Sequence, residues 1–236
     1  MHPFFFDEAI LAFFNKFAHK SIALDHFIYM ISENNLLKGG VIIGVFYYLW
    51  WAADSRINTM LDRRILTITI LSAFVAEIVC IILSLTLSYR ARPFINPDIV
   101  FSNPVEPSFW WNNHISSLPS DHATLFMALW LGIFTCNKKI GWYSLAYIIL
   151  VILLPRIYLG LHFPSDIVIG GLMGLMFVYI GLRMKIVERV ADYFIDFSLD
   201  YPQFFYPLIF LISYQLVDLF TESREFLAFF RHPYGQ

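Results

Sequence analysis

The sequence predicts an all-α membrane protein, a polytopic bundle of about six transmembrane helices that follows an interfacial N-terminal helix. Two observations predict this class. Of the 236 residues, 58% are hydrophobic and only 14% are charged, and the mean hydropathy is +0.64. Long apolar runs also recur along the chain at the length a bilayer requires, about 17–25 residues. With no repeat or low-complexity segment, the chain is expected to form one integral-membrane domain, residues 1–236.

The first 31 residues are expected to lie in the membrane interface rather than to span the bilayer. Residues 4–19, "FFFDEAILAFFNKFAH", combine an apolar face with a polar one, and a short apolar stretch, "IALDHFIYMIS", follows. An amphipathic pattern of this kind is typical of interfacial helices. The polar face is formed by Asp7, Glu8, Asn15 and Lys16. The segment lacks the basic start of a cleavable signal peptide, and none is expected.

Six apolar runs that follow are expected to span the membrane. They lie at about residues 36–53, 65–88, 121–137, 140–159, 164–183 and 203–220. The segment 89–120 is the only long polar loop between them. Within the second span, Glu77 is expected either to bond a neighbouring helix or to face the path of a lipid, because intramembrane acids are costly. In the long loop, "FWWNN" at 109–113 is typical of an interfacial aromatic belt or of an entrance for a lipid tail.

The distribution of basic residues predicts which side of the membrane each loop faces. The loop 89–120 and the connection 155–163 are separated by two spans and therefore lie on the same side. The connections on this side carry Arg90, Arg92 and Arg156. The opposite connections carry Arg56, Arg63, Arg64, Lys138, Lys139, Arg183, Lys185 and Arg189. The positive-inside rule places the second set in the cytoplasm, although basic residues in the terminal segments reduce the bias.

Charge and cysteine content exclude other classes of protein. The net charge is −2 and no basic block stands out, which argues against a nucleic-acid partner. Cys80 and Cys136 lie far apart within apolar runs, so neither a disulfide framework nor a metal site is expected.

Three polar motifs map to the outward side. The first is "SYRARPF", which contains Arg92; the second is "SLPSDHAT", which contains Ser120, Asp121 and His122; the third is "RIYLGLHFPSD", residues 156–166. In the third motif Asp166 follows His162 by four residues, a spacing that places both on one face of a helix. There the carboxylate is expected to orient the imidazole as a base or nucleophile.

These residue types suit phosphoryl transfer without a metal ion or another cofactor. Arg92 and Arg156 present planar forks that bind phosphate oxygens. Ser120 lies at a predicted helix N-terminus, where free N–H groups favour an anion. His122 and His162 can divide the remaining work, since one can attack phosphorus while the other protonates the leaving oxygen.

The motifs resemble those of the type-2 phosphatidic acid phosphatase family, which shares its site with vanadium haloperoxidases. The family pattern is Lys-x6-Arg-Pro, then Pro-Ser-Gly-His, then Ser-Arg-x5-His-x3-Asp, and the resemblance covers residues 65–183, the expected catalytic core. It implies that His162 is the nucleophile that forms a phosphohistidine, that Asp166 orients it, and that His122 is the general acid. It also implies that the phosphate is bound by Arg92, Arg156 and Ser120.

The chain departs from the family pattern at three positions. Leu85 stands where the family has lysine, Asp121 replaces the glycine, and Pro155 replaces the serine before Arg156. Arg90 is a possible substitute for the missing lysine, although an Arg that snorkels to the interface is the preferred interpretation. Asp121 is a possible site residue that changes substrate preference. With "RPF", "PSDHA" and "HFPSD", the chain most resembles bacitracin-resistance-type undecaprenyl pyrophosphate phosphatases.

The resemblance implies a bacterial plasma-membrane enzyme whose site faces the periplasm or the exterior. Its expected substrate is a lipid phosphate, undecaprenyl pyrophosphate first and phosphatidate or phosphatidylglycerophosphate second. Two alternatives stay open: a phosphotransferase on the same scaffold, and a non-catalytic lipid-binding or transport protein that retains an anion pocket.

Overall fold

The computed structural model describes residues 4–52, 56–106 and 116–219. The aromatic segment at 109–113 lies outside the described residues. Within the described ranges the chain forms helices and no strand, which confirms the all-α class. The elements are α1 (Phe5–Asn15), α2 (Ile22–Glu33), the π-helix η1 (Leu36–Gly40), α3 (Val41–Trp51), α4 (Arg56–Thr86), the short 3₁₀-helix η2 (Pro93–Ile95), α5 (Asp121–Cys136), α6 (Lys138–Tyr147), the π-helix η3 (Ile148–Leu153), α7 (Leu154–Tyr158), α8 (Pro164–Gly181), α9 (Lys185–Asp200) and α10 (Pro202–Val217).

The helices of the bundle correspond to the six predicted spans. Three helical stretches are apolar and long enough to cross a membrane: Asn58–Thr86, Lys138–Tyr158 and Pro164–Gly181. Three shorter apolar stretches accompany them: Leu36–Trp51, Asp121–Cys136 and Pro202–Val217. This arrangement is that of an integral membrane helical bundle.

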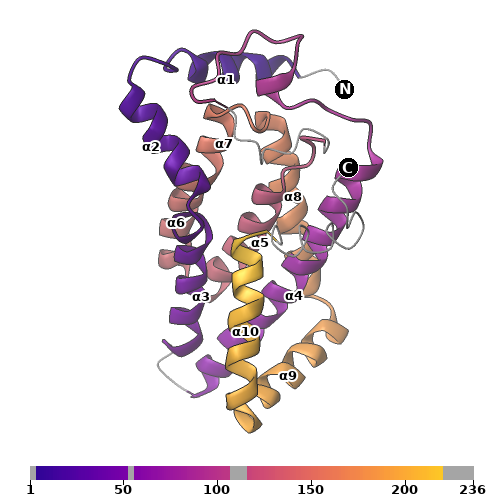
Figure 1. Ribbon diagram of the computed structural model, residues 1–236. Helices are drawn as coiled ribbons and strands as arrows, with labels where there is room; N and C mark the ends of the chain where they lie inside the picture. Colours follow the sequence, from indigo (N-terminus) through magenta and orange to yellow (C-terminus); the bar gives the residue numbers. More distant parts are fainter. Residues whose placement is uncertain (1–3, 53–55, 107–115, 220–236) are drawn as a thin grey trace, which may run out of the picture.

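Helix α9 was not predicted. It places Ala191 and Ile195 in the protein interior, one turn apart, as an amphipathic surface helix does. On its polar side, Arg64 of α4 contacts Glu188 at 3.1 Å and Asp192 at 2.6 Å. These contacts pair the basic start of α4 with α9 at the end of the bundle opposite α1 (Figure 1).

Helix α1 lies across the end of the bundle and contacts α7 and α8 (Figure 1). Glu8 and Lys16 are exposed, as the interfacial interpretation predicts. The expected exposure of Asp7 is wrong, because this side chain is completely buried. Its carboxylate binds the polar groups beneath α1, so the first turn of this helix is part of the protein interior.

Two glycines allow a close contact between helices α5 and α8. Helix α5 packs between α4 and α8, and α8 presents Gly170 and Gly174 to it. A Cβ atom on Gly170 would lie 2.4 Å from the carbonyl oxygen of Ser120, and one on Gly174 would lie 2.1 Å from that of Thr124. Small residues four apart allow two membrane helices this approach. The N-termini of α5 and α8, which carry two of the three motifs, are therefore held side by side.

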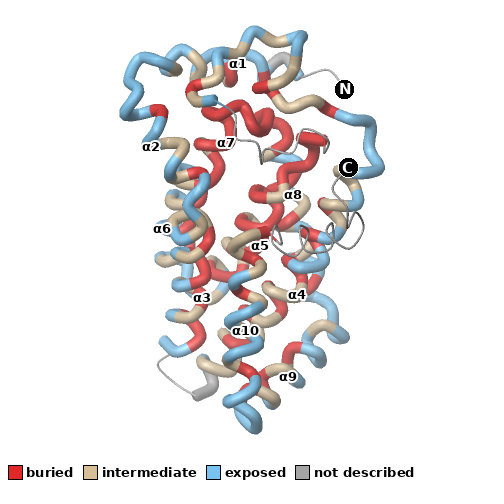
Figure 2. The backbone as a smooth tube through the Cα atoms, viewed as in Figure 1, coloured by how far each residue is buried: buried red, intermediate tan, exposed pale blue. Residues whose placement is uncertain are grey.

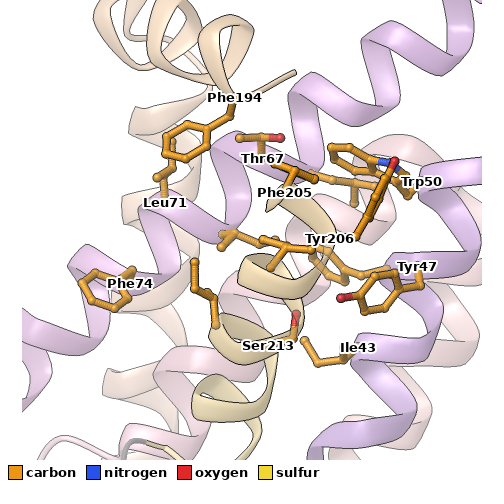
Figure 3. Close-up of a pocket in the computed structure, with 15 residues that line it drawn as sticks. Ile43, Tyr47, Trp50, Thr67, Leu71, Phe74, Phe194, Phe205, Tyr206 and Ser213 are labelled. Atoms are coloured by element: carbon orange, nitrogen blue, oxygen red, sulfur yellow. The ribbon is translucent and has the colours of Figure 1, made fainter. Parts of the chain in front are cut away.

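A pocket of about 320 Å³ lies among α3, α4, α9 and α10 (Figure 3). Its wall is almost entirely apolar and includes Tyr47, Trp50, Phe74, Phe194 and Phe205. No residue of the three motifs lines it. The pocket is thus separate from the polar cluster described next.

Candidate functional site

The three predicted motifs meet at one end of the bundle, where α7 and the starts of α5 and α8 are buried (Figure 2). Three backbone hydrogen bonds join the segments in pairs. They run from the Phe94 N–H to the Gly160 carbonyl (3.1 Å), from the Ser117 N–H to the Arg90 carbonyl (3.0 Å), and from the Ser120 N–H to the Asp166 carbonyl (3.2 Å). Each motif is therefore fixed to another by its own main chain.

His162 is held in one tautomer by a backbone carbonyl. Its Nδ1 lies 2.9 Å from the carbonyl oxygen of Ser117. Because a carbonyl only accepts, Nδ1 carries the proton and Nε2 keeps its lone pair. Burial, and next the charge of Arg92, lower the pKa of His162 to about 3, so the imidazole is neutral at pH 7. The side chain thus presents an unprotonated nitrogen beside an arginine.

The expected hydrogen bond between His162 and Asp166 is not formed, although the two side chains lie close together. Oδ2 of Asp166 lies 3.9 Å from Nδ1, too far for a hydrogen bond. Helix α8 begins only at Pro164, so His162 is not on the helix and the i, i+4 spacing does not align the two side chains. Asp166 instead accepts the Phe163 N–H at 2.9 Å and so caps the N-terminus of α8.

His122, Asp121 and Arg156 form a hydrogen-bonded row that lies beside His162. Nε2 of His122 accepts from Nη2 of Arg156 at 2.6 Å, and its Nδ1 donates to Oδ1 of Asp121 at 2.8 Å. The same Asp121 oxygen lies 3.9 Å from Nε2 of His162. Asp121 therefore stands between the two histidines. His122 is neutral in this arrangement. Its Nε2, which must carry the proton if His122 is to act as a general acid, instead accepts a hydrogen bond from Arg156.

The two predicted phosphate-binding arginines both have donors free for a ligand. The Nε atoms of Arg92 and Arg156 are buried and make no hydrogen bond with the residues that the structure describes. Arg156 is held in place by the Ser32 carbonyl at 3.1 Å and by Glu33 at 3.7 Å. Two guanidinium groups in one buried site favour an anion between them.

Ser120 serves as the N-cap of α5. Its Oγ accepts the Ala123 N–H at 3.4 Å, and the side chain is completely buried. The hydroxyl proton is not used in the cap. A contact between this hydroxyl and phosphate stays a prediction.

The expected snorkelling of Arg90 is wrong. The residue is only 1% exposed, and its guanidinium binds Asp7 at 2.7 Å and also Asp166. Its charge lies 4.1 Å from the centre of the Phe163 ring. Because both carboxylates already bind its guanidinium group, Arg90 does not substitute for the lysine of the family pattern. Leu85, at the lysine position, is 66% exposed and makes no contribution to the site.

Sequence reasoning missed Asp7, which joins α1 to the third motif. Its Oδ1 accepts the Ser165 N–H at 2.8 Å and its Oδ2 accepts the Ser165 hydroxyl at 2.7 Å. Oδ2 also accepts the Phe4 N–H at 3.0 Å. A signal was present: α1 and α8 both begin with Phe-x-x-Asp, "FFFD" and "FPSD", and both aspartates bind Arg90.

An all-helical membrane bundle that gathers two histidines and two arginines at one polar end has the composition of a membrane phosphohydrolase site. Comparison with known proteins agrees: residues 64–188 match the PAP2 superfamily. The chain belongs to this superfamily and is an integral membrane lipid phosphatase.

Among individual proteins, the chain is similar to the bacitracin transport permease protein BcrC of Bacillus licheniformis. The two are 25% identical over 169 residues, which cover 70% of this chain and 73% of BcrC. No solved structure matches the chain. Within the described ranges, His, Cys, Asp and Glu do not form a group of three suited to a metal ion.

Proposed function

We propose that the protein hydrolyses an isoprenoid diphosphate, undecaprenyl pyrophosphate first, to the lipid monophosphate through a phosphohistidine at His162 and without a metal ion. The observation that carries this proposal is the state of His162. Its Nδ1 proton is bound by the Ser117 carbonyl, and its neutral imidazole is buried beside Arg92. A fixed tautomer with a free nitrogen is what a nucleophilic histidine requires.

In the first step, Nε2 of His162 attacks the terminal phosphorus. The N–P bond forms while the bond between phosphorus and the bridging oxygen breaks, and the lipid monophosphate leaves with the electron pair. Arg92 and Arg156 stabilise the negative charge of the transferred group. Arg156 gives up its bond to His122 for a phosphate oxygen. Nε2 of His122 is then free to take up a proton and pass it to the leaving oxygen.

In the second step, water attacks the phosphohistidine. Nε2 of His122, unprotonated after the first step, accepts a proton from this water. Inorganic phosphate leaves, and His162 recovers its lone pair. His122 thus acts first as an acid and then as a base. It releases the proton taken from water when Arg156 re-forms its bond to Nε2, and the site returns to its starting protonation state.

The choice of a diphosphate rests on resemblance. The motifs "RPF", "PSDHA" and "HFPSD" are similar to those of bacitracin-resistance-type undecaprenyl pyrophosphate phosphatases, and the similar protein BcrC is named for bacitracin. Phosphatidate and phosphatidylglycerophosphate are the competing substrates. A phosphotransferase would use the same first step and differ only in the acceptor of the second.

Phosphate release from purified protein tests this function. In detergent with EDTA present, we expect release from undecaprenyl pyrophosphate to exceed release from phosphatidate, and vanadate to inhibit both. Loss of activity in EDTA would contradict the metal-free mechanism. Formation of a phosphorylated sugar or lipid acceptor, without release of inorganic phosphate, would identify a phosphotransferase instead.

A second candidate function is transport, because the name of BcrC describes a transport permease. The same assay separates the two functions. A transporter binds the lipid without releasing phosphate, whereas the phosphatase releases phosphate from lipid in a detergent micelle, where nothing is transported.

We also propose that the site faces the periplasm or exterior of a bacterial plasma membrane, and that residues 1–31 and the core 65–183 act as one domain. The basic residues at the end opposite the motifs support this orientation. In a variant without native cysteines, a cysteine at exposed Asp98 should react with an impermeant maleimide in intact cells. A cysteine at exposed Lys139 should react only after permeabilisation. The reverse pattern would overturn the orientation.

A further inference from the structure

Lys38 is an ammonium group near the candidate site that the proposed reaction does not use. It lies on the π-helix η1 between α2 and α3 and is half-buried. Its side chain forms no hydrogen bond or ion pair with any residue in the described part of the chain. A half-buried lysine usually has a carboxylate partner, because desolvating an unpaired charge is costly. Lys38 therefore has donors available to a ligand.

The backbone places Lys38 beside the elements that hold Arg156. Helix η1 contacts η3, the second π-helix, which continues directly into α7 and Arg156. π-helical turns are rare and frequently occur at functional sites. Ser32 and Glu33, just before η1, are the residues that bind the Arg156 guanidinium. The Tyr147 hydroxyl, which donates to the Leu37 carbonyl at 2.5 Å, fixes η1 against α6.

The charges around Lys38 are those of the candidate site. Glu33, Asp121 and Asp218 attract its ammonium, and Arg156 repels it. His122 also lies within electrostatic range of Lys38. By contrast, Arg92 is the arginine that acts most strongly on His162. The cationic groups are thus distributed along the site, with Arg92 near the nucleophile and Lys38 near His122.

The side chains of the site form a row of successive contacts. It runs from His162 through Asp121, His122 and Arg156 to Glu33. The phosphorus that is attacked must lie at the His162 end. A group beyond it, toward His122 and Arg156, is the leaving group that His122 protonates.

We infer that Lys38 binds the second, lipid-linked phosphate of a diphosphate, with Arg156 bridging this phosphate and the transferred one, and that Lys38 so selects diphosphates over monophosphates. This inference rests on the proposed function for the identity of the attacked phosphate. A monophosphate has no group at the Lys38 position. In a diphosphate this phosphate gains charge as the bridging bond breaks, and a nearby ammonium stabilises it.

Binding of inorganic pyrophosphate and inorganic phosphate to the purified full-length protein, with EDTA present, tests the inference directly. Replacing Lys38 with Gln should weaken pyrophosphate binding about tenfold, the value of one charge-assisted contact, and leave phosphate binding within about twofold. Lys38→Arg, which keeps the positive charge, should bind pyrophosphate nearly as tightly as the wild type does. Lys16→Gln, which removes an exposed lysine on the same side of the molecule, should change neither.

Equal weakening of both ligands, or no change in either, would overturn the inference. If Lys38→Gln lowers the melting temperature of the ligand-free protein, Lys38→Met, which keeps the aliphatic stem, is used instead, and its binding of pyrophosphate and of phosphate is compared in the same way. Hydrolysis of farnesyl diphosphate and farnesyl monophosphate then separates the two proposals. If the wild type hydrolyses both lipids and Lys38→Gln shows no selective loss with the diphosphate, the second-phosphate site is rejected, whereas the proposed phosphatase activity is retained. If Lys38 selectively supports pyrophosphate binding but neither lipid is hydrolysed, the proposed phosphatase activity is rejected, whereas the second-phosphate site is retained.

Discussion

Replacement of His162 with alanine is expected to reduce phosphate release from a lipid diphosphate by more than about a thousandfold, as removal of a covalent nucleophile does. No other imidazole in the described site has a nitrogen free to attack, because both ring nitrogens of His122 are bonded. Steady-state phosphate release measures this loss. Brief incubation of the wild-type protein with ³²P-labelled substrate should trap an acid-labile phosphoryl group that the variant lacks.

The matched control is His26→Ala, which removes an exposed histidine from α2. It should retain wild-type activity. Unchanged helical content in His162→Ala would show that the loss is chemical. Residual activity above about one per cent, or an acid-labile phosphoryl group that survives in the variant, would contradict the assignment of the nucleophile.

The buried state of His162 adds a second readout, the pH dependence of stability. The pKa of this residue is about 3 in the folded protein, against 6.5 for an unperturbed histidine. Below pH 6.5 the unfolded chain binds a proton that the folded one does not, so the free energy of unfolding falls by up to about 1.4 kcal/mol per pH unit. Between pH 7 and 5, the melting temperature of the wild type should fall more than that of His162→Gln. Parallel curves would contradict a neutral buried imidazole.

The bundle could be predicted because membrane spans are a local property of sequence. A run of apolar residues must reach a fixed length, and that length is read directly from the chain. Helix α9 was missed for the same reason: Lys185, Glu188 and Asp192 interrupt the apolar run, and only the spacing of Ala191 and Ile195 reveals its buried face.

The candidate site could be predicted only where its residues lie within short motifs. His122 lies beside Ser120 and Asp121 in the second motif, and Arg156 and His162 lie six residues apart in the third. The Ser117 carbonyl that orients His162 lies 45 residues away in the chain, and the contact between Asp7 and Arg90 joins residues 83 apart. Backbone carbonyls carry no residue-type signal, and pairings over such distances depend on how the helices pack.

Asp7 is the residue outside the motifs whose loss is expected to have the largest effect. Its carboxylate binds one arm of Arg90, while Asp166 binds the other, and it also caps the start of α8 through Ser165. Removing one partner of a buried ion pair typically costs about 3–5 kcal/mol. In Asp7→Asn, Arg90 and Ser165 lose a charged acceptor, and we expect the loop that carries His162 to lose its fixed position.

Asp7 contacts none of the predicted phosphate-binding residues, so its loss should act on kcat rather than on KM. We expect kcat of Asp7→Asn to fall about a hundredfold, the penalty for a misplacement of about 1 Å, with KM within about threefold. Glu8→Gln, which changes the next, exposed carboxylate, should leave both constants unaltered.

A double-mutant cycle with Arg90→Gln separates positioning from general destabilisation. If Asp7 acts through Arg90, the double variant should be hardly worse in kcat than Arg90→Gln alone, because the two residues form one network. Additive losses, or a kcat of Asp7→Asn within twofold of wild type, would show that α1 merely covers the site. The coupled result would make the interfacial helix part of the catalytic domain, since its first turn would determine where the nucleophile stands.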